Sequence, residues 1–235
     1  PMEICVKLPQ SQTRTAEPLS GSEQARVREF VLERPTPRRV GLLLQMELGL
    51  RIGEVCGLQW GVFDLEAGLL TVRRTVSRIY GPDGHTRLVI QTPKTRSSGR
   101  EIPIPRSLLP LLAELGREAG ADSWFLSGNT GRPVEPRCYR KSIQGYLRRA
   151  AVRKVHPHLL RHTFATTCLQ AGCDIKTLSE ILGHTDANIT LKRYVHSNLG
   201  RMRREMNRIF SLPDRSQKGS IKGRPNEKSP AAAGL

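Results

Sequence analysis

The chain has 235 residues, 37% hydrophobic and 25% charged, a composition typical of a globular protein that buries its own core. It has 38 Lys and Arg against 21 Asp and Glu, and the resulting charge of +17 predicts a polyanionic partner, most commonly a nucleic acid. No apolar run reaches the ~18 residues of a membrane span, the start has no apolar leader, and the five cysteines form no paired motif, which favours a reduced, cytoplasmic protein.

The first 19 residues hold three prolines among polar residues, which is typical of a linker. Because the chain starts with Pro1, we interpret it as a fragment or a processed product whose linker arrives from an upstream domain. A folded domain is expected from residue 20 onward, where Ser20 or Ser22 caps a helix with one apolar face.

Between residues 38 and 104 the pattern changes from helical to extended. A helix is expected over residues 38–48, ended by Gly49, and a short helical segment and a turn at 66–68 follow it. Strands are expected over residues 69–76, 87–91 and 100–104. A turn at 81–84 and a polar loop between the last two strands would join them into a three-stranded antiparallel meander.

After residue 105 the helical periodicity returns. Helices are expected over residues 108–119, 135–150, 158–171, 175–182, 189–195 and 199–209. The sequence therefore predicts a mainly α domain over residues 20–210 with a small three-stranded antiparallel β-sheet. Residues 211–235 are rich in Pro, Gly, Ser, Lys and Ala, which predicts a disordered basic tail.

The positive charge is concentrated in one stretch of the chain. Residues 137–161 hold eight Lys and Arg and neither Asp nor Glu, so these cations have no partners within the stretch. We interpret this run as a contact surface for a polyanion rather than a merely solvated helix face. The candidate DNA-binding residues in it are Arg137, Arg140, Lys141, Arg148, Arg149, Arg153 and Lys154.

Arg51 stands among apolar residues in the segment LGLRIGEVCGLQW. A buried or half-buried guanidinium needs a carboxylate partner or an anion. Glu54 follows three residues later, so a structural ion pair between the two is the simpler interpretation of this segment on its own.

A second polar cluster occupies the segment HPHLLRHTFATTCLQAG, where His158 and Arg161 share one face at the start of a helix. An imidazole, a guanidinium and a helix N-terminus together form a suitable phosphate site. Metal binding by His156, His158 and His162 is the alternative, which the adjacent arginine and the lack of a nearby carboxylate disfavour.

Three further residues are weak signals when taken singly. Lys94 lies in the polar loop TPKTRSSGR, His184 follows the helix-ending Gly183, and Tyr194 comes ten residues after His184. Together with the two arginines and His158, they form a set of phosphate-binding cations plus one phenol, which is the inventory that phosphodiester chemistry without a metal needs. The chain has neither a GxxxxGK[ST] loop nor the acidic cluster of a two-metal nuclease.

These segments resemble the tyrosine recombinases, also called phage-type integrases. LGLRIGEVCGLQW, TPKTRSSGREIPI, HPHLLRHTFATTCLQAG, ILGH and TLKRYVH occur in the family's order between about residues 19 and 210, and five such motifs in order are highly specific. The resemblance implies the family's catalytic-domain fold, double-stranded DNA at a recombination site as substrate, and no cofactor. It also implies that an upstream DNA-binding domain precedes residues 1–19 and that copies assemble on DNA as a tetrameric synapse.

Residue by residue, the resemblance implies that Arg51 and Arg161 bind the scissile phosphate, with Glu54 in support. Lys94 would be the general acid for the departing 5′ oxygen. Every catalytic position of the family pattern is filled by the expected residue type.

For the remaining positions, the resemblance implies that Tyr194 is the nucleophile that forms a 3′-phosphotyrosine link. His158 would assist proton transfer to or from this tyrosine, and His184 would hydrogen-bond the phosphate.

We therefore expect a bacterial, nucleoid-associated enzyme that integrates or excises a phage or a conjugative transposon. A chromosome or plasmid dimer-resolution recombinase is the alternative with the same chemistry, and a relaxase like type IB topoisomerases is a more distant one. A non-catalytic basic DNA-binding protein, in which all four polar sites are structural, is the alternative from another class.

Overall fold

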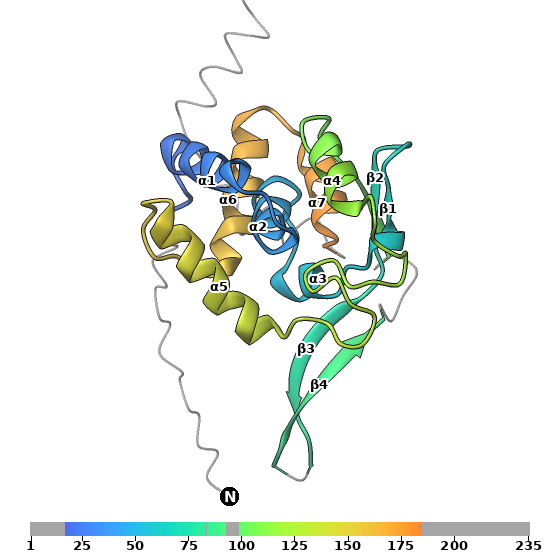
Figure 1. Ribbon diagram of the computed structural model, residues 1–235. Helices are drawn as coiled ribbons and strands as arrows, with labels where there is room; N and C mark the ends of the chain where they lie inside the picture. Colours follow the sequence, from blue (N-terminus) through green and yellow to red (C-terminus); the bar gives the residue numbers. More distant parts are fainter. Residues whose placement is uncertain (1–16, 83, 93–98, 185–235) are drawn as a thin grey trace, which may run out of the picture. The chain divides into compact units, whose positions relative to one another are not determined.

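The computed structural model describes residues 17–82, 84–92 and 99–184, which all lie in one compact unit of the chain (Figure 1). Its helices are α1 (Gly21–Glu33), α2 (Pro37–Glu47), α3 (Ile52–Cys56), α4 (Leu109–Gly116), α5 (Pro136–Arg149), α6 (Pro157–Gln170) and α7 (Ile175–Leu182). Its strands are β1 (Phe63–Asp64), β2 (Leu69–Val72), β3 (Thr75–Tyr80), β4 (Thr86–Gln91) and β5 (Arg100–Pro103), and a 3-10 turn, η1 (Trp60–Val62), precedes β1.

The fold is mainly helical with small antiparallel sheets, as predicted. The helices predicted from periodicity between residues 20 and 182 are all present, and their ends differ from the expected ones by a few residues. The predicted helices at 189–195 and 199–209, the linker over most of residues 1–19 and the tail at 211–235 lie outside the described residues. In the part of the chain that is described, no helix is long and apolar enough to cross a membrane.

Helix α2 forms the centre of the main core. Its residues from Val40 to Met46 are all buried, and α1, α3, α5 and α6 pack around it (Figure 1). Gly41 allows a close approach, since a Cβ there would lie 2.5 Å from the hydroxyl of Tyr139 on α5. That hydroxyl donates a hydrogen bond of 2.8 Å to the carbonyl of Arg38, which fixes α5 against the start of α2.

Local capping signals set the helix starts. Ser20 and Glu23 form the capping box of α1, and Thr36 caps α2 immediately before Pro37. The side chain of Asp174 accepts a hydrogen bond of 2.9 Å from the backbone N–H of Thr177 at the start of α7.

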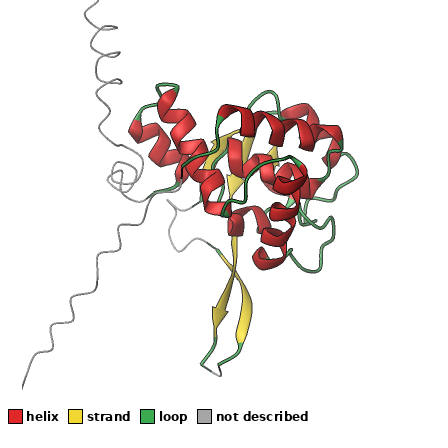
Figure 2. Ribbon diagram, turned by 90° about the vertical axis from the view of Figure 1, so that its left-hand side faces the viewer, coloured by secondary structure: helices red, strands yellow, loops and turns green. Residues whose placement is uncertain are grey.

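The strand pairing differs from the predicted meander. Strands β1, β2 and β5 form one three-stranded antiparallel sheet, while β3 and β4 form a separate hairpin. The predicted strand over residues 69–76 is therefore two strands, interrupted after Val72, and β4 does not pair with β5. The hairpin extends away from the helices (Figures 1 and 2), and its turn occupies the expected place.

The interruption has a cause in the packing of α3. A Cβ at Gly57 would lie 2.9 Å from the carbonyl oxygen of Arg74, and one at Gly53 would lie 2.6 Å from that of Val76. The two glycines thus bring α3 onto the backbone at residues 74–76, where the chain leaves the first sheet and enters the hairpin. The alternation of residues 69–76 by itself does not indicate this contact with α3.

A second, smaller apolar cluster joins α6 to α7. It consists of Phe164, Ala165, Leu169, Leu178 and Leu182. This cluster fixes the C-terminal end of α7, where Gly183 adopts a left-handed conformation with φ of +63° and His184 follows.

Candidate active site

A pocket of about 300 Å³ brings together the two separated motifs that the sequence singled out. Arg51, at the start of α3, and His158 and Arg161, on the first turns of α6, all line it. Arg140 of α5 contributes a third guanidinium. The pocket is therefore rich in donors suited to a phosphate group.

Arg51 occupies the N-cap position of α3, and its side chain is 41% exposed. Its backbone N–H donates to Glu54 Oε2 over 2.8 Å, and its Nη1 donates to Glu54 Oε1 over 2.8 Å. The ion pair that the spacing of the two residues suggested is thus present, and it holds an arginine that also faces the pocket.

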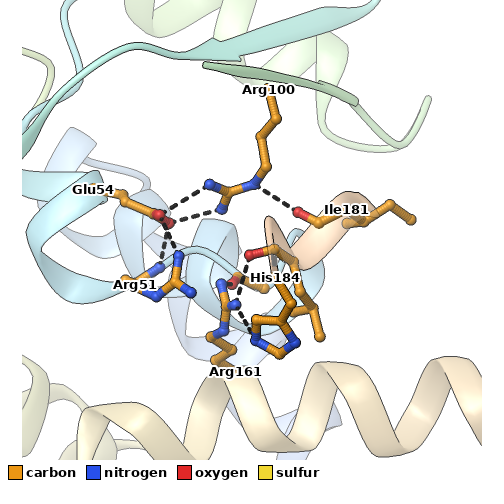
Figure 3. Close-up of polar contacts among 8 residues, drawn as sticks. Arg51, Glu54, Arg100, Arg161, Ile181 and His184 are labelled. Atoms are coloured by element: carbon orange, nitrogen blue, oxygen red, sulfur yellow. Dashed lines mark hydrogen bonds and ion pairs between the residues drawn. The ribbon is translucent and has the colours of Figure 1, made fainter. Parts of the chain in front are cut away.

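Glu54 is the buried centre of a three-residue ion cluster (Figure 3). Arg100, on β5, binds both of its carboxylate oxygens, Nη1 to Oε1 and Nη2 to Oε2, each over 2.9 Å. Burial raises the pKa of Glu54, but the hydrogen bonds and charge of Arg100, followed by the charge of Arg51, outweigh it and lower the pKa to about 2. Glu54 is therefore ionised throughout the neutral range.

The lowered pKa of Glu54 predicts a stability difference that depends on pH. Because the folded-state pKa of about 2 lies below the ordinary value of 4.5, ionised Glu54 stabilises the fold above pH 4.5 and loses this effect as pH falls towards 2. We expect Glu54→Gln to lower the free energy of unfolding at pH 7 by about 3 kcal/mol. Urea denaturation should show this difference shrinking between pH 4.5 and the acid limit of folding, and a constant difference would contradict the assignment.

Arg161 is the most deeply placed of the pocket arginines, with 1% of its surface exposed. Its Nη1 donates to the carbonyl of Gly49 over 2.7 Å, and its Nη2 donates to the carbonyl of Leu182 over 2.6 Å. Both carbonyls lie at helix C-terminal ends, after α2 and in α7, where backbone acceptors lack partners in the helix and the dipole favours a cation. The Nη2 of Arg161 also lies 3.0 Å from Nε2 of His184 (Figure 3).

The structure thus brings four of the six predicted catalytic residues into one region. Arg51, His158 and Arg161 line the pocket, and His184 contacts Arg161. The predicted general acid, Lys94, and the predicted nucleophile, Tyr194, lie outside the described residues.

Arg100 is the site residue that the sequence analysis missed. Its partners are 46 and 81 positions away, so no local spacing reveals them. One signal was available: in REIPI the alternation places Arg100 on the same side of the strand as Ile102, and both are buried. A charged residue on the buried side of a strand indicates a buried ion pair.

The candidate DNA-binding residues follow α5 and the loop after it. Arg137, Arg140, Lys141, Arg148, Arg149, Arg153 and Lys154 are all exposed. Arg153 differs from the others, because it donates to the carbonyls of Glu17 and Pro18 and forms an ion pair with Glu23 at 3.2 Å.

The metal interpretation of the histidines has no support in the described residues. Among them, no group of three His, Cys, Asp or Glu side chains is placed to hold a metal ion, and this includes His156, His158 and His162. His158 instead lines the pocket together with Arg51, Arg140 and Arg161.

The chain matches known proteins along most of its length. Residues 20–201 match the family model described as the phage integrase family. A tyrosine recombinase XerC-like protein of Caldanaerobacter subterraneus is 33% identical over 172 residues, covering 66% of this chain and 44% of its own length. The tyrosine recombinase XerC of Xanthomonas axonopodis pv. citri is 30% identical over 196 residues, covering 81% of this chain and 57% of its own. The chain thus spans about half the length of these curated relatives.

Solved structures show the same fold. The Tn1549 transposon integrase, in complex with a circular intermediate DNA, matches with a TM-score of 0.66 and 27% identity, over 83% of this chain and 67% of that one. The XerA recombinase matches with a TM-score of 0.61 at 22% identity, over 89% of this chain and 69% of that one.

Proposed function

The chain belongs to the phage integrase family of tyrosine recombinases, and we propose that it cleaves and rejoins DNA strands through a covalent 3′-phosphotyrosine intermediate. The observation that carries this proposal is the pocket in which Arg51, Arg161 and His158 converge, with His184 beside Arg161. Guanidiniums arranged in this way neutralise the non-bridging oxygens of a phosphodiester and stabilise the charge that develops in the transition state.

In the proposed reaction, the phenol oxygen of Tyr194 attacks the phosphorus and forms the phosphotyrosine bond. His158 receives the phenolic proton, and Lys94 donates a proton to the 5′ oxygen as the P–O5′ bond breaks. His184 and the two arginines hold the phosphate. Rejoining is the reverse of these steps with a 5′-hydroxyl as the nucleophile, so the ester bond energy is kept and no cofactor is consumed.

Covalent trapping tests this proposal. A pool of duplexes with randomised sequence, each nicked near its centre, releases a short 5′-hydroxyl fragment after cleavage, so that rejoining fails. We expect protein–DNA adducts that survive a denaturing gel and yield one sequence motif when recovered. DNA binding without any adduct would contradict the proposal and favour the non-catalytic DNA-binding alternative.

We propose that the recombinase serves a mobile element, a phage or a conjugative transposon, in the cytoplasm of a bacterium. The likeness to the Tn1549 transposon integrase supports this role. The XerC relatives favour the second candidate, resolution of chromosome or plasmid dimers. The position of the trapped motif in the host genome distinguishes the two roles. For a mobile element, the motif lies at the ends of the element that carries the gene. For dimer resolution, it lies at one chromosomal or plasmid site.

We propose that four copies act together, since exchange between two duplexes cleaves four strands and each chain supplies one Tyr194. We also propose that residues 1–19 follow an upstream domain that holds the opposite face of the DNA. The matched relatives support such a domain, because about half of their length lies outside the part that this chain matches.

Cleavage is expected to survive chelation. The proposed reaction meets the phosphate charge with Arg51, Arg161 and Lys94 and moves protons through side chains. Covalent trapping in excess EDTA should give the same yield as in magnesium buffer. A yield that falls with EDTA and returns with added zinc or magnesium would contradict this prediction.

The exposed cations of α5 are expected to bind phosphates along the DNA. Affinity should fall with salt at a log–log slope of about −0.9 per phosphate contacted. Lys141→Gln and Arg148→Gln should each make this slope shallower by up to about that amount, as measured by fluorescence anisotropy on a labelled duplex. Arg153→Gln is the matched control and should change it less, because Arg153 is bound to Glu23 within the protein. Equal changes in all three variants would contradict this assignment.

A further inference from the structure

Arg100 is buried beside the pocket without lining it. Its side chain is 8% exposed and makes three hydrogen bonds at once: two to the carboxylate of Glu54 and one, from Nε, to the carbonyl of Ile181 over 2.7 Å (Figure 3). A residue placed in this way acts on a bound phosphate only through its neighbours.

The first neighbour is Glu54, which contacts Arg100 and Arg51 at similar distances. A buried carboxylate with Arg51 as its sole partner would pair with it fully and cancel its charge. Since Arg100 occupies both carboxylate oxygens, the cluster of two guanidiniums and one carboxylate keeps a net positive charge, which Arg51 presents to the pocket.

The second neighbour is the end of α7. Ile181, whose carbonyl Arg100 binds, directly precedes Leu182, whose carbonyl binds Arg161. Gly183 completes the contact, because a Cβ there would lie 2.9 Å from Cδ and Nη1 of Arg100. The buried side chain of Arg100 thus contacts the groups that support Arg51 and those that support Arg161.

We propose that Arg100 is a positioning residue: it is the counterion of Glu54 and thereby leaves the positive charge of Arg51 available to the scissile phosphate. This inference rests on the proposed function, since it assigns Arg51 to a DNA phosphate. It assigns no contact with DNA to Arg100 itself.

Charge-compensating variants test the proposal. Arg100→Gln should lower the single-turnover rate of adduct formation by about tenfold or more with little change in DNA affinity, because Glu54 then neutralises Arg51. The double variant Arg100→Gln/Glu54→Gln should recover most of this loss. Arg100→Lys keeps the charge but cannot form the two parallel hydrogen bonds to Glu54. Its rate of adduct formation should therefore lie between those of the wild type and Arg100→Gln. Arg28→Gln, in the ion pair of Arg28 with Glu47 on α1 and α2, is the matched control and should leave the rate unchanged.

A merely structural role for Arg100 predicts that the rates of all variants follow their thermal stability, because an unpaired buried carboxylate destabilises the fold more than loss of the whole pair does. The proposal predicts instead that Arg100→Gln slows adduct formation even at temperatures where thermal denaturation shows this variant to be fully folded. If Arg100→Gln does not fold, the comparison of Arg100→Lys with Arg100→Lys/Glu54→Gln gives the same test, because removal of the carboxylate charge should again raise the rate.

A second readout does not depend on cleavage. Inorganic sulfate is titrated into the full chain while the Nε–H NMR signal of Arg51 is followed. Sulfate affinity should fall several-fold in Arg100→Gln and recover in the double variant. Equal affinity in the wild type and Arg100→Gln, or no response of Arg51 in the wild type, would overturn the inference. The expected sulfate result in a protein that forms no DNA adduct would overturn the proposed function and leave the role of Arg100 standing.

Discussion

Tyr194→Phe is expected to abolish the covalent protein–DNA adduct. The substitution removes one hydroxyl group, whose oxygen is the atom that would bond to phosphorus, and it leaves a side chain of nearly the same shape. The fold and the DNA affinity should therefore persist. Denaturing gels of trapped reactions, together with anisotropy binding curves, measure the two properties side by side.

Tyr80→Phe is the matched control for this experiment. Tyr80 is 83% exposed on the β3–β4 hairpin, so the loss of its hydroxyl should leave the adduct yield unchanged. An adduct formed by Tyr194→Phe at the wild-type yield would assign the nucleophile to another residue.

Arg161→Lys is expected to slow adduct formation by about 10²- to 10³-fold, the typical cost of losing one transition-state donor. Lysine keeps the positive charge, but a single ammonium cannot donate to the carbonyls of Gly49 and Leu182 and also keep the planar fork towards a phosphate. Single-turnover trapping measures the rate, and thermal denaturation reports whether the fold is retained.

The control is another arginine that binds a backbone carbonyl. Arg39 donates to the carbonyl of Phe30 over 3.1 Å and does not line the pocket. Arg39→Lys should keep the wild-type rate. A rate in Arg161→Lys equal to that of this control would mean that the scissile phosphate binds elsewhere.

The sequence was informative where the determining contacts are local. Capping residues and apolar periodicity placed the start of α1 and both ends of α2 and of α4 to α7 to within a few residues, because caps and helix faces depend on neighbours three or four positions away. The family resemblance implied that Arg51, His158 and Arg161 act at one phosphate, and the structure places these three residues around one pocket.

Long-range contacts account for what the sequence did not reveal. The break between β2 and β3 depends on Gly53 and Gly57 meeting a backbone about 20 residues further along the chain. The role of Arg100 depends on partners from α3 and α7, which its own strand does not indicate. Both features arise when elements pack, and a single sequence carries no local pattern for them.

The two arginines that we propose to bind the phosphate, Arg51 and Arg161, differ in which nearby substitutions would displace them. Arg161 is held by main-chain carbonyls, which every residue type supplies, so no particular side chain provides its two backbone acceptors. Arg51 depends on the side chains of Glu54 and Arg100, and a single codon change can remove either. Saturation mutagenesis should therefore find the inactivating changes around Arg51 at the charged residues Glu54 and Arg100. Around Arg161 it should find them at Gly49 and Gly183, which are left-handed and where an added Cβ would lie within 3.0 Å of a neighbouring atom. The support of Arg161 is therefore sensitive to the backbone conformation around it and insensitive to side-chain charge. The support of Arg51 depends on the charges of two neighbouring side chains.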